Sequence, residues 1–337
     1  MSKITIKILA KELQLSVSTV SKAIKDSHEI SNETKLRVTE MVKKLNYIPN
    51  AYAGSLGSRN SKTIGVVIPE VVDSFFALAI NGIESIAQKN GYHVLIYLTH
   101  ESFEKEKTIL KDFESGRVDG VLMSVSRETT QHDHIDDLLK TGVPLVFFDR
   151  TFDEIETTQI TTNDYESAYL ATEHLIKNGC KKILFLSFSN ILSITSKRLR
   201  GYQDALVAHN LALSEDNIIP FYKESKIDYL NLRSKLESPG SADGIIASVE
   251  KLAIPIYQVC EELQLNIPGD IQVISFSNLE TAAFLNPPLT TITQPAFEIG
   301  KTAAAVLMKA LGKKKIELLK EEIIIPSTIV IRKSTKC

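Results

Sequence analysis

Hydroxyl and ammonium groups recur at close spacing near the start of the chain, in the segment Val17-Ser18-Thr19-Val20-Ser21-Lys22. The hydroxyls of Thr19 and Ser21 can donate to phosphate oxygens. The ammonium of Lys22 can donate to O6 and N7 of guanine, although without the two-pronged geometry that arginine offers. This chemistry is typical of contact with a DNA duplex.

The elements around this segment are of the kind that would present it to DNA. Two short amphipathic patterns, residues 6–13 and 17–24, are separated by three residues and predict a helix-turn-helix, whose second helix enters the major groove. A third pattern ends in an apolar stripe at helical spacing over residues 38–45. Each pattern is preceded by a hydroxyl side chain that can cap the helix by accepting a backbone N–H: Thr5, Ser16 and Ser31.

A second group of polar residues follows short apolar runs later in the chain. From Thr63 such runs alternate with helical patterns, which predicts a parallel sheet with helices on both faces, and the alternation restarts near Ile160, which predicts a second, similar lobe. Ligands of open sheets bind beyond the carboxyl ends of the strands. The candidates there are Asp73-Ser74-Phe75-Phe76, Ser124, Asp149-Arg150, Asn163-Asp164, Val249-Glu250-Lys251 and Ser277-Asn278.

The expected elements of this α/β part can be given by residue number. The expected strands are 64–68, 93–98, 120–124, 145–148, one starting at 160, 182–186, 244–247 and 271–276. The expected helices are 76–89, 103–115, 135–140, 165–177, 197–209, 253–263 and 297–311, the last of which would complete the first lobe after the chain crosses back near Thr291.

Composition and charge restrict the class of protein. The hydrophobic content of 43% predicts folded cores, and the net charge of −2 conceals a head, residues 1–62, of net charge +6 on a body of net charge −8. A basic head is suited to DNA phosphates. Three scattered cysteines predict no disulfide framework, and no apolar run indicates a signal peptide or a membrane span. We therefore expect a cytoplasmic protein without membrane contact.

Taken together, these motifs resemble the LacI/GalR family of bacterial repressors over essentially the whole chain. The head matches through Val17-Ser18-Thr19-Val20-Ser21-Lys22 and Leu45-Asn46-Tyr47-Ile48-Pro49-Asn50. The body matches through Thr63-Ile64-Gly65-Val66-Val67-Ile68-Pro69, Ser74-Phe75-Phe76, Arg117-Val118-Asp119-Gly120, Asp149-Arg150, Arg200-Gly201-Tyr202, Pro268-Gly269-Asp270 and Pro287-Pro288-Leu289-Thr290-Thr291-Ile292-Thr293-Gln294-Pro295. Each motif is weak alone, but their joint presence in family order is specific.

The resemblance implies an all-α helix-turn-helix head joined to a two-lobed α/β effector domain like that of periplasmic binding proteins. The implied boundaries are 1–49 for the head, 50–60 for a hinge helix and 61–337 for the body, with one lobe at 61–161 and 293–324 and the other at 162–292 and 325–337. It further implies a homodimer on a near-palindromic double-stranded operator, switched by a small effector. Since the sequence shows no leucine heptad tail, we expect a dimer rather than a tail-mediated tetramer.

The resemblance also assigns DNA contacts. The implied residues are Thr5, Ser16, Val17, Ser18, Thr19, Ser21, Lys22, Ser31, Asn50, Ala53, Ser55 and Leu56. Leu56 matches a leucine that wedges between base pairs. Gly54 and Gly57 depart from the family pattern, and each costs a helix roughly 0.5–1 kcal/mol relative to alanine. We therefore expect the hinge to become helical only on operator, which circular dichroism of a free 50–60 segment would test.

Seven positions are implied to contact the effector: Phe76, Ser124, Asp149, Arg198, Glu250, Ser277 and Gln294. The alternative for Arg198 is a surface salt bridge, and for Asp149 a structural pair with Arg150. Family members often carry Asn-Asp where this chain has Val249-Glu250, and Asp where it has Ser277. The leading effector class is a sugar or sugar derivative, while Lys251 leaves room for a phosphorylated or acidic ligand.

Several motifs carry no expected function. His132-Asp133-His134 lacks a further ligand at useful spacing and is expected in a solvated loop, and Cys260 is expected in a core. We find no phosphate-binding loop, dinucleotide fingerprint or nucleophile elbow, so we expect neither an enzyme nor a cofactor or metal. The sequence thus predicts a ligand-responsive transcriptional regulator, expected to repress carbohydrate-metabolism genes. The alternative, a sugar-binding protein without a DNA role, fits the basic head less well.

Overall fold

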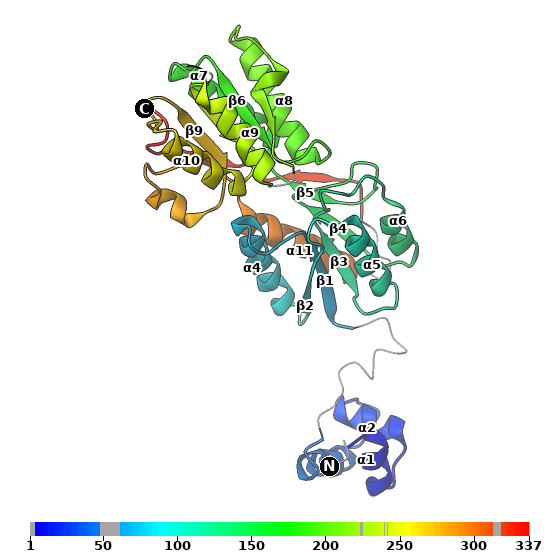
Figure 1. Ribbon diagram of the computed structural model, residues 1–337. Coiled ribbons are helices and arrows are strands. Elements are labelled where there is room, and N and C mark those ends of the chain that lie inside the picture. The colour runs from blue at the N-terminus through cyan, green and yellow to red at the C-terminus, as the bar shows by residue number, and fades with distance from the viewer. Residues whose placement is uncertain are drawn as a thin grey trace. The chain divides into compact units, whose positions relative to one another are not determined.

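Two units make up the chain in the computed structural model, Met1–Ser61 and Lys62–Cys337, and each is described by itself (Figure 1). The structure describes residues 4–47, 61–222, 225–238, 240, 242–312 and 318–336. Four residues with an expected role on DNA, Asn50, Ala53, Ser55 and Leu56, lie outside these ranges, as does the expected hinge helix.

The first unit is a three-helix head of α1 (Ile6–Leu13), α2 (Val17–Ile24) and α3 (Asn32–Lys44). Its core contains Leu9, Leu13, Val20, Ala23 and Val38 among its buried side chains. Gln14, with φ 55°, turns the chain between α1 and α2. The expected helix-turn-helix is therefore present, built around one small apolar core.

Two of the three expected helix caps in the head form. The hydroxyl of Ser16 accepts from the Thr19 N–H at 3.0 Å, and that of Ser31 accepts from the Thr34 N–H at 3.3 Å. The expected cap by Thr5 is wrong. Thr5 occupies the position before α1, but its hydroxyl makes no capping bond, and only its main-chain carbonyl accepts from the first turn, from Ile8 at 3.0 Å and Leu9 at 3.2 Å.

The second unit contains two six-stranded sheets. In the first, the strand order is β11-β5-β4-β3-β1-β2, and the described pairs are all parallel. These strands are β1 (Thr63–Ile68), β2 (His93–Leu98), β3 (Gly120–Met123), β4 (Leu145–Phe148), β5 (Gln159–Thr161) and β11 (Glu322–Ile324). Every residue of β1, β3 and β4 is buried, as expected for central strands covered on both faces.

The second sheet has the order β12-β10-β9-β8-β6-β7 and is parallel except for β12, which pairs antiparallel to β10. Its strands are β6 (Ile183–Ser187), β7 (Ile218–Pro220), β8 (Gly244–Ala247), β9 (Gln272–Phe276), β10 (Thr290–Thr293) and β12 (Thr328–Val330). We call the part built on the first sheet the N-lobe and the part built on the second the C-lobe. Thr293 still pairs in the C-lobe sheet, one residue past the expected division.

Helices cover both sheets. The N-lobe carries α4 (Ser74–Lys89), α5 (Phe103–Phe113), α6 (Asp133–Lys140) and α11 (Ala296–Leu311), and the C-lobe carries α7 (Asp164–Lys177), α8 (Ser193–Ala208), α9 (Lys226–Glu237) and α10 (Ala253–Glu262). Figure 1 shows α4 beside α11 and, farther along the N-lobe, α5 beside α6. The expected return of helix 297–311 to the N-lobe is thus seen in α11.

Glycines bring α4 and α11 into close contact. A Cβ atom on Gly300 would lie 2.0 Å from the carbonyl oxygen of Ala79, and one on Gly82 would lie 2.1 Å from that of Phe297. A side chain at either position could be accommodated only if one of the two helices moved. The close contact anchors the amino-terminal end of α4, which faces the cleft described below.

The expectation that His132-Asp133-His134 forms a solvated loop is wrong. Asp133 and His134 begin α6, and the His134 side chain is buried, with Nε2 2.8 Å from Oε1 of Glu106. Glu106 also accepts from the Ser126 N–H at 2.7 Å and from the Thr129 hydroxyl at 2.9 Å. The histidine therefore helps to fix the loop after β3. Within the described ranges, no cluster of three or more His, Cys, Asp or Glu could hold a metal ion.

Two further features concern the cysteines and the membrane. Cys260 is buried in the C-lobe core as expected, and burial raises the pKa of its thiol to about 11. None of the helices that the structure describes combines the length and apolar character needed to cross a bilayer.

Candidate DNA-binding surface and effector cleft

The outer face of α2 carries the expected DNA contacts of the head. Val17, Ser18 and Lys22 are exposed, while Val20 and Ala23 point into the core. The Ser16 hydroxyl lies 2.7 Å from that of Ser18 and 2.8 Å from that of Thr19. These hydroxyl groups thus form a cluster at the amino-terminal end of α2, where helix N–H groups favour an anion such as phosphate.

An acidic residue that sequence analysis missed sits next to the expected base-reading lysine. The ammonium of Lys22 makes an ion pair with Glu29, and both side chains are about half exposed. Such an exposed pair contributes about 0–1 kcal/mol. Glu29 therefore orients Lys22 in the free head and would compete with an acceptor on DNA.

The cleft of the body lies between its two lobes. It is lined by Asp73, Phe75, Phe76, Asp149, Arg150, Ile194, Arg198, Val249, Glu250, Phe276, Ser277, Asn278 and Gln294. Most of these follow the carboxyl ends of strands in one sheet or the other, which is the position expected from parallel topology. The remaining cavity measures about 20 Å³.

Six of the seven expected effector residues line this cleft, and Ser124 does not. Ser124 directly follows β3 and stays in the plane of the sheet, where its N–H donates to the Val67 carbonyl at 2.9 Å. Its hydroxyl is fully buried and has no hydrogen-bond partner among the described residues. The structure therefore gives Ser124 no direct access to a ligand.

Arg198 of α8 is held rigidly at the bottom of the cleft. Its Nε donates to Oδ1 of Asp164 at 2.6 Å, and its Nη1 donates to the Ser248 carbonyl at 2.6 Å. Its guanidinium lies 3.9 Å above the centre of the Phe276 ring. The side chain is 2% exposed, so the alternative of a surface salt bridge is wrong. Nη2 has no partner among the described residues and remains able to donate to a ligand.

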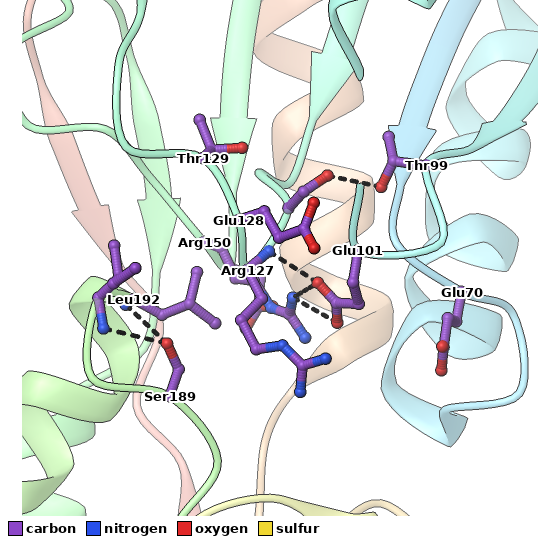
Figure 2. A network of polar contacts seen from close by, with 12 residues as sticks. Glu70, Thr99, Glu101, Arg127, Glu128, Thr129, Arg150, Ser189 and Leu192 are labelled. Atoms are coloured by element: carbon purple, nitrogen blue, oxygen red, sulfur yellow. Dashed lines mark hydrogen bonds and ion pairs between the residues drawn. The ribbon is translucent and has the colours of Figure 1, made fainter. Parts of the chain in front are cut away.

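Arg150 has two acidic neighbours, Glu101 and Asp149. Nη1 of Arg150 donates to both carboxylate oxygens of Glu101, at 3.0 and 2.9 Å, whereas its Nε lies 3.7 Å from Oδ2 of Asp149. The primary ion pair is thus Arg150–Glu101 (Figure 2). The Asp149–Arg150 ion pair of the structural alternative is therefore present as the longer of the two, and the Asp149 carboxyl also lines the cleft.

Glu101 is a residue that sequence analysis missed. It follows β2 with φ 61°, and besides Arg150 it accepts from the Arg127 N–H at 2.7 Å, as Figure 2 shows. Burial acts to raise the pKa of Glu101, but Arg150 and these hydrogen bonds outweigh it and lower the pKa. The ionised Glu101 therefore fixes both Arg150 and the loop that carries Arg127.

Glu250 begins a 3-10 turn, η3 (Glu250–Leu252), after β8. Its Oε1 accepts from the N–H and the hydroxyl of Ser74, at 3.2 and 2.7 Å. Its Oε2 accepts from the Ser277 hydroxyl and the Asn278 N–H, both at 2.9 Å. The adjacent Lys251 ammonium lies 3.8 Å from a carboxylate oxygen of Glu70 and 4.3 Å from the centre of the Phe188 ring.

The other cleft groups include further acids and an amide donor. Asp73 caps α4 by accepting from the Phe75 N–H at 2.9 Å, and burial together with Glu250 raises its pKa. The main-chain carbonyl of Gln294 accepts from the Asn278 side-chain amide at 2.6 Å, while Nε2 of the Gln294 side chain has no partner among the described residues. The cleft thus combines carboxyl acceptors, unpartnered N–H donors and the faces of Phe76 and Phe276.

The titration of Asp149 gives a testable pH dependence. Burial raises the pKa of Asp149 to about 7, against the opposing influence of Arg150 and Arg198. Because the folded chain binds this proton more tightly than the unfolded chain, we expect the free energy of unfolding to fall as pH rises from about 4 to 7, by up to about 4 kcal/mol. Denaturant unfolding measured at several pH values should show this fall.

The control for this expectation is Asp149→Asn, which removes the titrating group but keeps its size. In that variant the fall between pH 4 and 7 should be smaller. An unchanged pH profile would show that Asp149 is already ionised in the folded chain at pH 4.

Comparison with known proteins agrees with both parts of this geometry. Residues 5–50 match the model of bacterial regulatory proteins, lacI family, and residues 172–335 match that of a periplasmic binding protein-like domain. The ribose operon repressor of Haemophilus influenzae is 32% identical over 330 residues, 98% of each chain. The catabolite control protein A of Staphylococcus xylosus is 31% identical over 335 residues, 99% of each chain.

Solved structures show the same fold. The lac repressor dimer bound to operator and the anti-inducer ONPF matches over 100% of both chains with a TM-score of 0.83 at 22% identity. A LacI family transcriptional regulator from Enterococcus faecium with bound ribose is 28% identical and matches with a TM-score of 0.70, covering 81% of this chain and 98% of the other. The family and the fold class predicted from the sequence are confirmed. The chain belongs to the lacI family of bacterial regulatory proteins and is a ligand-responsive, DNA-binding repressor rather than an enzyme.

Proposed function

We propose that the chain is a cytoplasmic homodimer that binds a near-palindromic operator of carbohydrate-metabolism genes and is switched by a neutral sugar or sugar derivative held between its lobes. The operator is read by the head at residues 1–49, through the residues of α2. It is also contacted by the hinge at residues 50–60, which includes Asn50, Ala53, Ser55 and Leu56. The lobes divide at the three crossings of the body, near residues 161, 293 and 325.

The observation that carries the effector class is the set of groups at the cleft wall. Arg198 Nη2 and Gln294 Nε2 are buried donors without a partner among the described residues, and the Asp149 carboxyl is a buried acceptor beside them. Such alternating donors and acceptors, flanked by aromatic rings, suit the hydroxyl groups and apolar face of a sugar. Relatives with bound D-xylulofuranose and with bound ribose support this class.

The charges of the cleft favour a neutral ligand over an acidic one. Asp73, Asp149 and Glu250 line the cleft, whereas Arg150 and Arg198 are already engaged with Glu101 and Asp164. Lys251, which left room for a phosphorylated ligand, lies beside Glu70. An added anion would therefore lie against three acidic side chains, while both arginines already have carboxylate partners.

Selection of randomised duplex DNA by the purified protein tests this function, with and without D-ribose, D-xylulose, cellobiose and their phosphates. We expect a palindrome whose recovery changes with a neutral sugar and whose affinity falls steeply with salt. A palindrome that responds only to a sugar phosphate would overturn the neutral effector. If no sequence is enriched, the operator role fails and a sugar-binding protein without a DNA role becomes the better interpretation.

A further inference from the structure

The Glu250 carboxylate joins the two lobes across the cleft. Two of its four hydrogen bonds come from Ser74, at the first position of α4 in the N-lobe, and two come from Ser277 and Asn278, after β9 in the C-lobe. Oε1 accepts only from the N-lobe and Oε2 only from the C-lobe. If the lobes separate, the carboxylate therefore cannot keep both pairs of hydrogen bonds.

The donors around Glu250 are suited to an ionised carboxylate. Two of them are the backbone N–H groups of Ser74 and Asn278, which can donate but not accept. The Ser74 N–H belongs to the amino-terminal end of a 16-residue helix, where partial positive charge favours an anion. Hydrogen bonds to a charged acceptor are stronger than those to a neutral one.

Glu250 also occupies the space that a ligand needs. The cleft retains only about 20 Å³, room for roughly one water molecule. Pockets that bind small molecules measure roughly 300–1,000 Å³. In this conformation the cleft is closed on the protein's own side chain.

We propose that Glu250 is an internal latch that holds the cleft closed in the absence of effector, and that an effector must displace its carboxylate and offer acceptor oxygens to the same donors. This proposal rests on the proposed function, since it concerns the regulation of the same cleft. The Glu70–Lys251 pair at 3.8 Å joins the lobes at a second point but is partly exposed and contributes less.

Side-chain length makes the latch specific to glutamate. The carboxylate extends from η3 to Ser277 and Asn278 within its own lobe and reaches Ser74 with its other oxygen. An aspartate is shorter by one methylene and keeps the charge. Glu250→Asp should therefore retain bonds within the C-lobe and lose those across the cleft, whereas Glu250→Ala should lose both.

Distances between the lobes test the latch without any ligand. Nitroxide labels are placed on Glu84→Cys in α4 and Asn231→Cys in α9, both exposed, in the full chain carrying Cys337→Ser, while the buried Cys180 and Cys260 remain. When the doubly labelled chain is mixed with an excess of unlabelled chain, so that each dimer carries at most one labelled subunit, pulsed electron paramagnetic resonance should give one narrow distance for the parent chain. Glu250→Asp and Glu250→Ala should shift and broaden the distribution, and Ser74→Ala should shift it less.

Two controls keep the result interpretable. Glu261→Ala removes an exposed carboxylate from α10 of the same lobe and should leave the distribution unchanged. Thermal unfolding identifies a variant that fails to fold, and Ser74→Ala, on the opposite lobe, then provides the second measurement.

A distribution that is broad in the parent chain, or identical in the parent, Glu250→Asp and Glu250→Ala, would overturn the latch. Such a result leaves the DNA selection unaffected. Conversely, the selection can recover no operator while the distance between the lobes still changes in the Glu250 variants. That result would overturn the proposed function and leave the latch in place.

Discussion

Replacing Arg198 by methionine is expected to lower the affinity for the effector at least about 30-fold and to leave operator binding without effector unchanged. Methionine retains the contact with the Phe276 ring but removes every donor of the guanidinium. Truncating a buried, hydrogen-bonded charge at a binding interface costs about 2–5 kcal/mol, which corresponds to a loss of roughly 30-fold to several thousand-fold. Isothermal calorimetry with the sugar recovered from the DNA selection measures the first effect, and electrophoretic mobility shift measures the second.

The same substitution also affects stability, and the two effects can be separated. Arg198→Met leaves the buried Asp164 without its 2.6 Å partner, which should lower the free energy of unfolding by about 3–5 kcal/mol. Adding Asp164→Asn removes the buried charge and should restore part of this stability. Because Asp164 does not line the cleft, the double variant should still fail to bind the effector.

Arg200→Met is the matched control for this experiment. Arg200 lies on the same helix, is 77% exposed and faces Asp204 at 3.7 Å, so its loss should change neither affinity nor stability appreciably. Effector affinity that is unchanged in Arg198→Met would remove Arg198 from the binding site. Restored affinity in the double variant would show that Arg198 acts only through stability.

The central strands could be predicted from sequence because each is a short apolar run buried on both faces. Of these, β4 and β8 begin and end at the expected residues, as does the edge strand β2, which is only partly buried. β7, β11 and β12 have three residues each, too few to show a period, and α9 buries only Leu232 and Leu236. β11 pairs with β5, which lies far from it in the sequence, and local sequence patterns cannot predict such a contact.

The positions of the cleft residues were predictable, but most of their partners were not. The carboxyl ends of parallel strands meet at one edge, so Asp149, Glu250 and Ser277 could be placed near a ligand by strand order alone. The hydrogen bond between Glu250 and Ser74 depends on how far the lobes close. The one between Arg150 and Glu101 depends on the left-handed backbone conformation of Glu101, which belongs to no sequence motif. Local sequence carries no signal for either.

Lys22→Ala is expected to weaken binding to the specific operator by about 10- to 100-fold while changing the affinity for random DNA only slightly. Lys22 is the exposed amine on the outer face of α2, one turn beyond the hydroxyl cluster at its amino-terminal end. Loss of a base contact costs about 1–3 kcal/mol and relaxes specificity at one position, whereas loss of a phosphate contact weakens binding to all sequences alike.

Two further head variants distinguish these cases. Lys43→Ala removes the same charge from the exposed end of α3 and should reduce specific and random binding by the same small factor. Glu29→Gln removes the acid that pairs with Lys22 and should raise operator affinity a few-fold, since the lysine no longer has to leave an ion pair. Fluorescence anisotropy at several salt concentrations measures all three variants. If Lys22→Ala instead weakens operator and random DNA equally, the lysine contacts phosphate, and the specificity of the head must come from other side chains of α2, with Val17 and Ser18 the first to examine.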